Sequence, residues 1–389
     1  MKSKEFLQQL VNIRRAIHRY PELGDQEFKT TAFVEKELKK LKIETHRITP
    51  TGIVGILKGG VKGKKTIALR ADIDALPIQE QTNVDYASMR PGIMHACGHD
   101  ANTTMALGAA MLLAERRTEI QGTIKFIFQP NEESSGGAKS MLDAGVLSSP
   151  TVDAIVGMHI SPWLPCGVLG LKPREMMAAV DRFTIEIIGE GGHGAYPHLS
   201  TDAIVVAAQV VNALQAIVSR EIDPAEPVVV TIGAIHGGER YNIICDKVIM
   251  VGTVRTITRA THTRIKRLIE NKVRHITASC GARYTFAFEE LGNVLINNDR
   301  ILDTCKSSGE KVLGTKHVAF LRNPSMGGED FAEYLQKIPG CFVYMGAASG
   351  KKVYPWHHEK FNIDERALPL GAHFLADVAQ RYLNSNSYK

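Results

Sequence analysis

Hydrophobic positions recur along the start of the chain at the spacing of an amphipathic helix. Between residues 5 and 20 the apolar side chains fall on one stripe, and a second helix is predicted over residues 28–40. Short apolar runs then alternate with helical segments. Strands are predicted over 66–70, 123–128 and 154–157, and helices over 103–114 and 137–144. This alternation predicts a layered α/β domain.

The pattern changes near residue 180. Phe183, Ile185 and Ile187 alternate with polar residues, which is typical of a half-exposed strand in an antiparallel sheet. A helix over 201–219, strands over 227–235 and 247–255, a helix over 259–279 and a strand over 283–289 follow. We therefore expect an α/β fold in which a mixed-sheet catalytic domain (1–179 and 293–389) carries an inserted two-layer α+β domain (180–292).

Composition narrows the classes of function. The 389 residues carry a net charge of +6, and 44% of them are hydrophobic. We find no uninterrupted apolar run of about 20 residues and no signal-peptide core, which predicts a cytoplasmic protein without a membrane partner. No basic run accompanies the 6% of aromatic residues, which argues against nucleic acid as a partner. The six cysteines are dispersed and are expected to be reduced.

Residues suited to metal chemistry follow several predicted strands. Cys97 and His99 are two positions apart, so in an extended chain their side chains would point the same way. A thiolate with an imidazole suits zinc or a similar ion. Either Asp74 or Asp100 could orient the imidazole from behind.

Two acids follow the strand over 123–128. Side chains of adjacent residues are expected to point apart, so one carboxylate of Glu132 and Glu133 could bind metal while the other faces a water molecule. A metal hydrolase needs such a ligand and a separate base. His159 and the adjacent pair His357 and His358 supply further imidazoles.

Together these segments resemble the M20 metallopeptidase superfamily, in its branch of N-acyl-amino-acid amidohydrolases such as hippurate hydrolases, aminoacylases, N-acetyl-diaminopimelate deacetylases and auxin-conjugate hydrolases. The matching stretches are 18–23, 70–77, 94–100, 129–133, 157–159, 192–198, 328–331 and 356–358. The resemblance implies two divalent ions per subunit and Glu132 as general base. It implies as metal ligands Cys97, His99, Glu133, His159 and His357, the last preferred to His358 because the family places its ligand first. Zinc, manganese and cobalt all suit this set.

Residues 189–194 match G-x-G-x-x-G by letter. A dinucleotide site would need a buried parallel strand, an immediate helix and an acid about 20 residues later, and none is found here. The glycines instead present His193. The resemblance implies that His193 reaches the active site of a partner subunit, where it would stabilise an oxyanion, and that Asn242 contacts substrate. Arg255, at a strand end, could bind a substrate carboxylate through two hydrogen bonds or form a surface ion pair.

The predicted reaction is hydrolysis of the amide bond of N-acyl amino acids, with an N-acetyl or N-aroyl group, to a carboxylic acid and a free amino acid. The alternative within the family is a metallo-carboxypeptidase or dipeptidase that acts on short peptides. The resemblance also implies a homodimer or higher homo-oligomer formed through the inserted lid domain. A non-catalytic scaffold would be expected to lack a ligand or the base, yet all of them are present.

Overall fold

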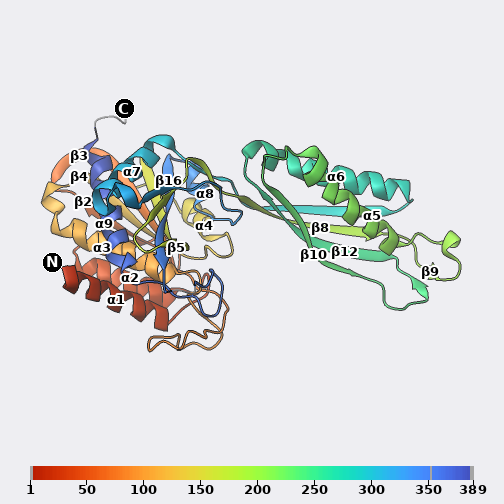
Figure 1. Ribbon diagram of the computed structural model, residues 1–389, viewed down its shortest axis with the longest axis horizontal. Helices are drawn as coiled ribbons and strands as arrows, with labels where there is room; N and C mark the ends of the chain where they lie inside the picture. Colours follow the sequence, from red (N-terminus) through yellow and green to blue (C-terminus); the bar gives the residue numbers. More distant parts are fainter. Residues whose placement is uncertain (1–2, 351–352, 386–389) are drawn as a thin grey trace. The chain divides into compact units, whose positions relative to one another are not determined.

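The computed structural model describes residues 3–350 and 353–385, and the chain forms two compact units. Unit 1 comprises Met1–Met176, Ile296–Asn323 and Asp330–Lys389. Unit 2 comprises Met177–Leu295 together with the short segment Pro324–Glu329. Figure 1 labels the elements of each unit.

Unit 1 is built on an eight-stranded mixed sheet in the order β1-β2-β4-β3-β5-β16-β6-β15. The strands are β1 (Glu44–Arg47), β2 (Ile53–Lys58), β3 (Val61–Asp72), β4 (Gln121–Gln129), β5 (Ala154–Pro165), β6 (Leu169–Leu171), β15 (Val318–Phe320) and β16 (Gly340–Ala348). The four central strands β4, β3, β5 and β16 run parallel. Their continuous apolar runs are buried on both faces, as in α/β proteins.

Unit 1 also contains the helices α1 (Ser3–Arg19), α2 (Phe28–Lys40), α3 (His99–Glu115), α4 (Gly137–Asp143), α7 (Asp299–Leu313), α8 (Ala332–Leu335) and α9 (Ala367–Asn384). Helix α3 is buried almost throughout and packs against α9 and α1. A Cβ at Gly108 of α3 would lie only 2.7 Å from Cβ of Ala372 in α9, so glycine permits this close approach.

Unit 2 contains a four-stranded antiparallel sheet in the order β10-β12-β8-β13. Its elements are β8 (Ala179–Ile188), β10 (Val228–Gly237), β12 (Lys247–Thr256), β13 (Arg283–Gly292), α5 (Ala203–Ala216), the π-helical turn η3 (Ile217–Glu221) and α6 (Arg259–Ser279). The buried side chains of β8 alternate with mostly half-buried ones, and Phe183, Ile185 and Ile187 share a hydrophobic core with both helices. The predicted fold class, a mixed α/β domain with an inserted two-layer α+β domain, is confirmed.

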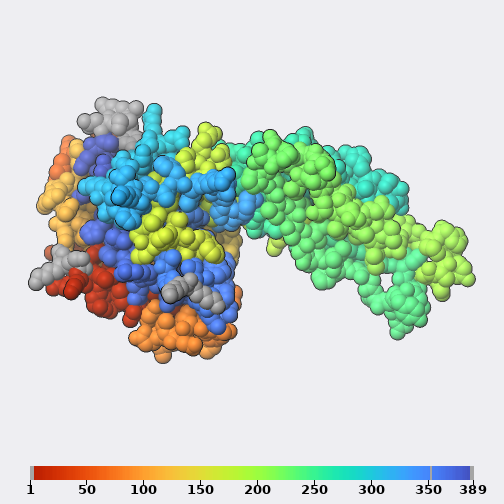
Figure 2. All heavy atoms as spheres, in the orientation of Figure 1, coloured from red at the N-terminus to blue at the C-terminus, as the bar shows by residue number. Residues whose placement is uncertain are grey.

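Short elements complete the described part of the chain. They are β7 (Arg174–Met177) paired with β14 (Leu295–Asn297), β9 (Gly192–His193) paired with β11 (Ile243–Ile244), and the turns η1 (Arg117–Glu119), η2 (Pro197–Leu199) and η4 (Thr315–His317). Figure 2 shows the β9 segment, in yellow-green, at the surface of unit 2.

The helical stretch Ala203–Glu221 is long and apolar enough, by length and composition, to cross a membrane, although polar residues interrupt its apolar run. One face of α5, which includes Val206, Val210 and Leu214, belongs to the core of unit 2.

Candidate metal centre

The parallel strands of unit 1 end at one edge of the sheet, where the candidate residues gather. Asp72 at the end of β3 lies in register with Gln129 at the end of β4, and Arg70 lies in register with Gly157 of β5. The chain after β3, the Glu132–Glu133 turn and His159 are therefore brought to the same edge, where open α/β sheets place their sites. His159 lies within β5 rather than after it, because this strand continues to Pro165, well beyond the predicted end at 157.

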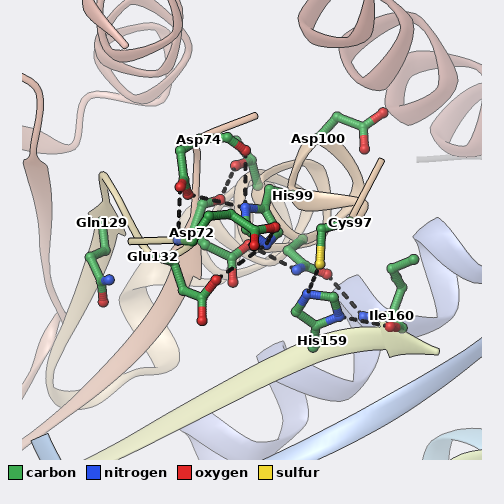
Figure 3. A network of polar contacts seen from close by, with 12 residues as sticks. Asp72, Asp74, Cys97, His99, Asp100, Gln129, Glu132, His159 and Ile160 are labelled. Atoms are coloured by element: carbon green, nitrogen blue, oxygen red, sulfur yellow. Dashed lines mark hydrogen bonds and ion pairs between the residues drawn. The ribbon is translucent and has the colours of Figure 1, made fainter. Parts of the chain in front are cut away.

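The expectation that Cys97 and His99 share an extended segment is wrong. Gly98 between them has a left-handed φ of 94°, and His99 is the first residue of α3, four positions before the predicted start. A helical start after a left-handed glycine still brings the two side chains together. Ligand atoms of Cys97, His99 and His159 lie within 4.8 Å of one another, and Sγ of Cys97 is 3.5 Å from Nε2 of His159 (Figure 3).

A second group adjoins the first. Ligand atoms of Cys97, Glu133 and His357 also lie within 4.8 Å of one another, and Nε2 of His357 is 3.4 Å from Oε2 of Glu133. The two groups share Cys97 and together contain all five ligands expected from the family resemblance. His358 belongs to neither group; its ring lies against Tyr354 and its Nδ1 is 3.7 Å from Glu359.

The two adjacent carboxylates do not point apart as expected. Oε2 of Glu132 is 3.9 Å and Oε1 of Glu133 is 3.8 Å from the same atom, Nε2 of His99. The residues lie in a turn rather than in extended chain, so the alternation of a strand does not apply. Both carboxylates therefore face the cluster.

Asp74, not Asp100, orients His99. Nδ1 of His99 lies 3.0 Å from the carbonyl oxygen and 3.1 Å from the carboxylate of Asp74, which also accepts a hydrogen bond from the backbone N–H of Glu133. Nδ1 of His159 lies 2.7 Å from the carbonyl oxygen of Ile160. In each imidazole Nδ1 is thus engaged and Nε2 faces the cluster, as in metal-binding histidines.

The cluster fits a metal ion. Nε2 of His99 and Oε1 of Glu133 are buried, and neither has a hydrogen-bond partner within the described residues. Buried polar atoms are nearly always paired. A cation between these two atoms would satisfy both.

Electrostatics favour the metal-binding form of one donor and make the others depend on a bound cation. Burial opposes protonation of His99, but Asp72 and Cys97 raise the pKa of its imidazole well above the usual value, so His99 must lose a proton to bind a metal. Burial lowers the pKa of His159 to about 4, which favours the neutral imidazole that binds metals. Burial and then the charge of Glu133 raise the pKa of the Cys97 thiol well above its usual value, so its thiolate requires a neighbouring cation. Burial opposes ionisation of Asp72, but His99 and Arg70 outweigh it and lower the pKa of Asp72 to about 2.

A buried polar network that the sequence did not predict lies beneath the site. Arg70 donates to Asp72 at 2.7 Å and to Asp330 at 2.9 Å, and the side-chain amide of Gln129 donates to both carboxylate oxygens of Asp330. These residues fix the ends of β3 and β4 to the segment that begins at Asp330. The stretches 70–77 and 328–331 are both among the family motifs. The contact between Arg70 and Asp330 joins residues 260 positions apart, so no pattern of neighbouring residues predicts it.

The remaining candidates lie in unit 2. His193 and Asn242 are exposed and adjacent: His193 pairs with Ile243, and Gly194 N–H donates to the carbonyl oxygen of Asn242 at 2.9 Å. Arg255 lies elsewhere, opposite Val180 at the start of β8, where it donates to Thr253. Because β9 follows the C-terminal end of β8 and Arg255 lies beside its N-terminal end, about 25 Å of strand separates Arg255 from His193.

The chain matches the family described as Peptidase family M20/M25/M40 over residues 68–381. It is 43% identical to an N-acetylcysteine deacetylase of Bacillus subtilis, over 97% of this chain and 98% of the relative. It is 39% identical to thermostable carboxypeptidase 1 of Saccharolobus solfataricus, over 96% and 95%. A solved Bacillus subtilis structure, described as a dinuclear metal binding peptidase from the M20 family, matches with a TM-score of 0.86 at 38% identity, over 98% of this chain and 99% of that one. The chain therefore belongs to the M20 family and is a metal-dependent amidohydrolase or peptidase.

Proposed function

We propose that this enzyme hydrolyses the amide bond of N-acyl amino acids with two divalent ions per subunit. The observation that carries the proposal is the convergence of two three-residue ligand groups on Cys97, with the Glu132 carboxylate beside them. One ion would be held by Cys97, His99 and His159, and the other by Cys97, Glu133 and His357. Zinc or manganese, and also cobalt, suit these ligands.

Bound divalent ions polarise the substrate carbonyl and acidify water. In this chain Glu132 is the residue placed to act as general base. Its carboxylate lies at the cluster, where it could also join His99 and Glu133 as a ligand, but the two groups that share Cys97 are complete without it. It takes the proton from the attacking water and passes it to the leaving nitrogen, so that one carboxylate serves both halves of the reaction.

Unit 1 serves as the catalytic domain and unit 2 as lid and dimerisation domain in this proposal. His193, in β9 after the end of β8, and Arg255, in β12 beside the start of β8, are too far apart to contact one small substrate from a single copy. In a homodimer, Arg255 could bind the substrate carboxylate while the partner subunit's His193 stabilises the oxyanion and its Asn242 positions the substrate. The exposed Ile204 and Val205 on α5 are suited to such an interface. The cytoplasm is the proposed location.

A carboxypeptidase or dipeptidase is the second candidate, favoured by the 39% identity to the thermostable carboxypeptidases of Saccharolobus solfataricus. Both reactions break an amide bond next to a free carboxylate. The substrates differ in the group on the other side of that bond, which is a simple acyl group in an N-acyl amino acid and an aminoacyl group with a free amine in a dipeptide.

The test is a panel of N-acetylcysteine, N-benzoylglycine and unblocked dipeptides, assayed together with measurement of bound metal. We expect turnover of the N-acyl amino acids, its loss when a chelator removes about two ions per subunit, and its recovery when the ions are returned. Turnover of dipeptides alone would favour the second candidate. Full activity in the metal-free protein would refute both.

A further inference from the structure

Both tryptophans of the chain lie beside the candidate metal centre. The ring of Trp356 meets that of His159 edge to face, with 5.4 Å between the ring centroids, and Trp163 lies 6.5 Å from Trp356 in the same manner. Trp163 is in β5, four residues beyond His159, and Trp356 directly precedes His357. Each tryptophan is thus carried by a segment that also carries a proposed ligand.

The two rings differ in their surroundings. Trp356 packs against the hydrophobic core and against Tyr344, at 5.8 Å, and its buried Nε1 has no hydrogen-bond partner among the residues described. Packing alone therefore positions this ring. Trp163 is 60% exposed. A single exposed apolar side chain needs no explanation, but this one continues an aromatic surface that ends at a proposed metal ligand.

We propose that Trp163 and Trp356 form a subsite for a planar apolar group attached to the scissile amide. The inference rests on the proposed function and narrows its substrate class to aromatic N-acyl amino acids. Trp356 is the fixed wall, and Trp163 is the open face against which a substrate ring stacks or meets edge to face. Aromatic pairs prefer these two arrangements to a sandwich of aligned rings. The planar group is either an aroyl group or the aromatic side chain of the amino acid.

Kinetics of the metal-loaded, full-length enzyme test this subsite. The substrates are N-benzoylglycine, N-acetylphenylalanine and N-acetylglycine, compared by kcat/KM. Trp163→Ala should reduce the preference for one aromatic substrate over N-acetylglycine by about tenfold. Its kcat/KM for N-acetylglycine should fall by a smaller factor, because this substrate carries no ring to stack on Trp163. Trp163→Phe should retain most of the preference. The substrate that loses its advantage identifies the group that the subsite holds.

Matched measurements separate the subsite from the reaction. Phe320→Ala removes a similarly exposed aromatic ring of unit 1 from a different strand and should leave the preference unchanged. Because the chain has only two tryptophans, their fluorescence also reports binding. Benzoate or phenylalanine, but not acetate, should change the emission of the wild type, and Trp163→Phe should lose most of that change.

An unaltered preference in Trp163→Ala would overturn the subsite while the proposed function stands. Failure of the wild type to hydrolyse any of the three substrates would instead count against the proposed function. A ligand-dependent change in emission would then still support the aromatic subsite.

Discussion

At the scale of single residues, the turn after β4 decides how the two carboxylates act. Asn131 has a left-handed φ of 51°, a conformation that asparagine tolerates better than most residues. Its backbone N–H donates to Glu27 and its side-chain amide donates to Asp25. These bonds hold the turn from which both Glu132 and Glu133 face His99.

Glu132→Gln should abolish turnover and leave metal binding intact. The amide keeps the size of the side chain but cannot accept the proton, so we expect kcat to fall by 10² to 10⁴ fold, roughly the contribution of a general base. Glu133→Gln is the neighbouring control and should reduce bound metal as well as kcat. Rates combined with metal analysis distinguish the two. A Glu132→Gln enzyme with near-normal turnover would disprove the assignment.

His357 and His358 offer an equally direct comparison. Only His357 approaches Glu133, and it does so from a left-handed backbone with φ of 64°. His357→Ala should weaken metal binding by about tenfold or more, since a ligand is lost outright. His358→Ala should bind metal like the wild type. Titration with a competing chelator measures both variants, and equal losses would show that the pair is interchangeable.

At the scale of elements, α1 fixes the helix that begins with His99. Asp100, in the first turn of α3, accepts a hydrogen bond from Nε of Arg14 at 2.9 Å and lies 2.8 Å from Nδ1 of His18. Nε2 of His18 lies 3.2 Å from Glu80. Asp100, proposed from sequence as a partner of His99, instead ties α3 to α1.

Arg14→Met should destabilise the protein strongly, because it removes the guanidinium from the buried Asp100 carboxylate and leaves His18 as its remaining partner. The expected loss in free energy of unfolding is about 3–5 kcal/mol. The neighbour Arg15 also pairs with Glu365 but is partly exposed, so Arg15→Met should cost about 1 kcal/mol or less. Urea denaturation of both variants provides the measurement. Similar losses would mean that burial of the pair is not the deciding factor.

Glu27, just before α2, should make stability depend on pH. Burial raises its pKa to about 7, although backbone hydrogen bonds oppose the shift. The folded state therefore favours the protonated form. This contribution is fully present below about pH 4.5 and is lost as the pH rises to about 7, with a total of about 3 kcal/mol.

Glu27→Gln should remove this dependence and keep the acceptor for Asn131. The free energy of unfolding of the variant minus that of the wild type should be larger at pH 8 than at pH 4.5, by about 3 kcal/mol. Urea denaturation at the two pH values measures this difference. The idea fails if the difference between variant and wild type is the same at both.

At the scale of the whole molecule, the proposed dimer predicts that disrupting unit 2 stops catalysis in unit 1. Ile204→Lys combined with Val205→Lys places two charges on the exposed apolar face of α5. We expect a monomer in analytical ultracentrifugation and a loss of kcat with metal content unchanged, because the partner's His193 would be absent. Arg267→Glu, on the exposed face of α6, should alter neither property. A monomeric variant with full activity would exclude a contribution from the partner subunit.

The sequence by itself determined the fold class, the family and the set of candidate ligands. Hydrophobic periodicity depends on neighbouring residues, and it predicted α6 over the residues that the structure assigns to it. The motifs are also local, so their resemblance to M20 enzymes could be recognised and was confirmed by the comparisons. The individual roles of the site residues remain predictions.

Only the tertiary structure decided how these residues meet. The parallel register of β3, β4 and β5 gathers segments that lie far apart in sequence, and left-handed residues at Gly98, Asn131 and His357 set the direction of the side chains beside them. Sequence periodicity assumes a regular strand or helix, and these turns are neither. The choice of Asp74 over Asp100, and the convergence of Glu132 and Glu133, follow from contacts that no local pattern encodes.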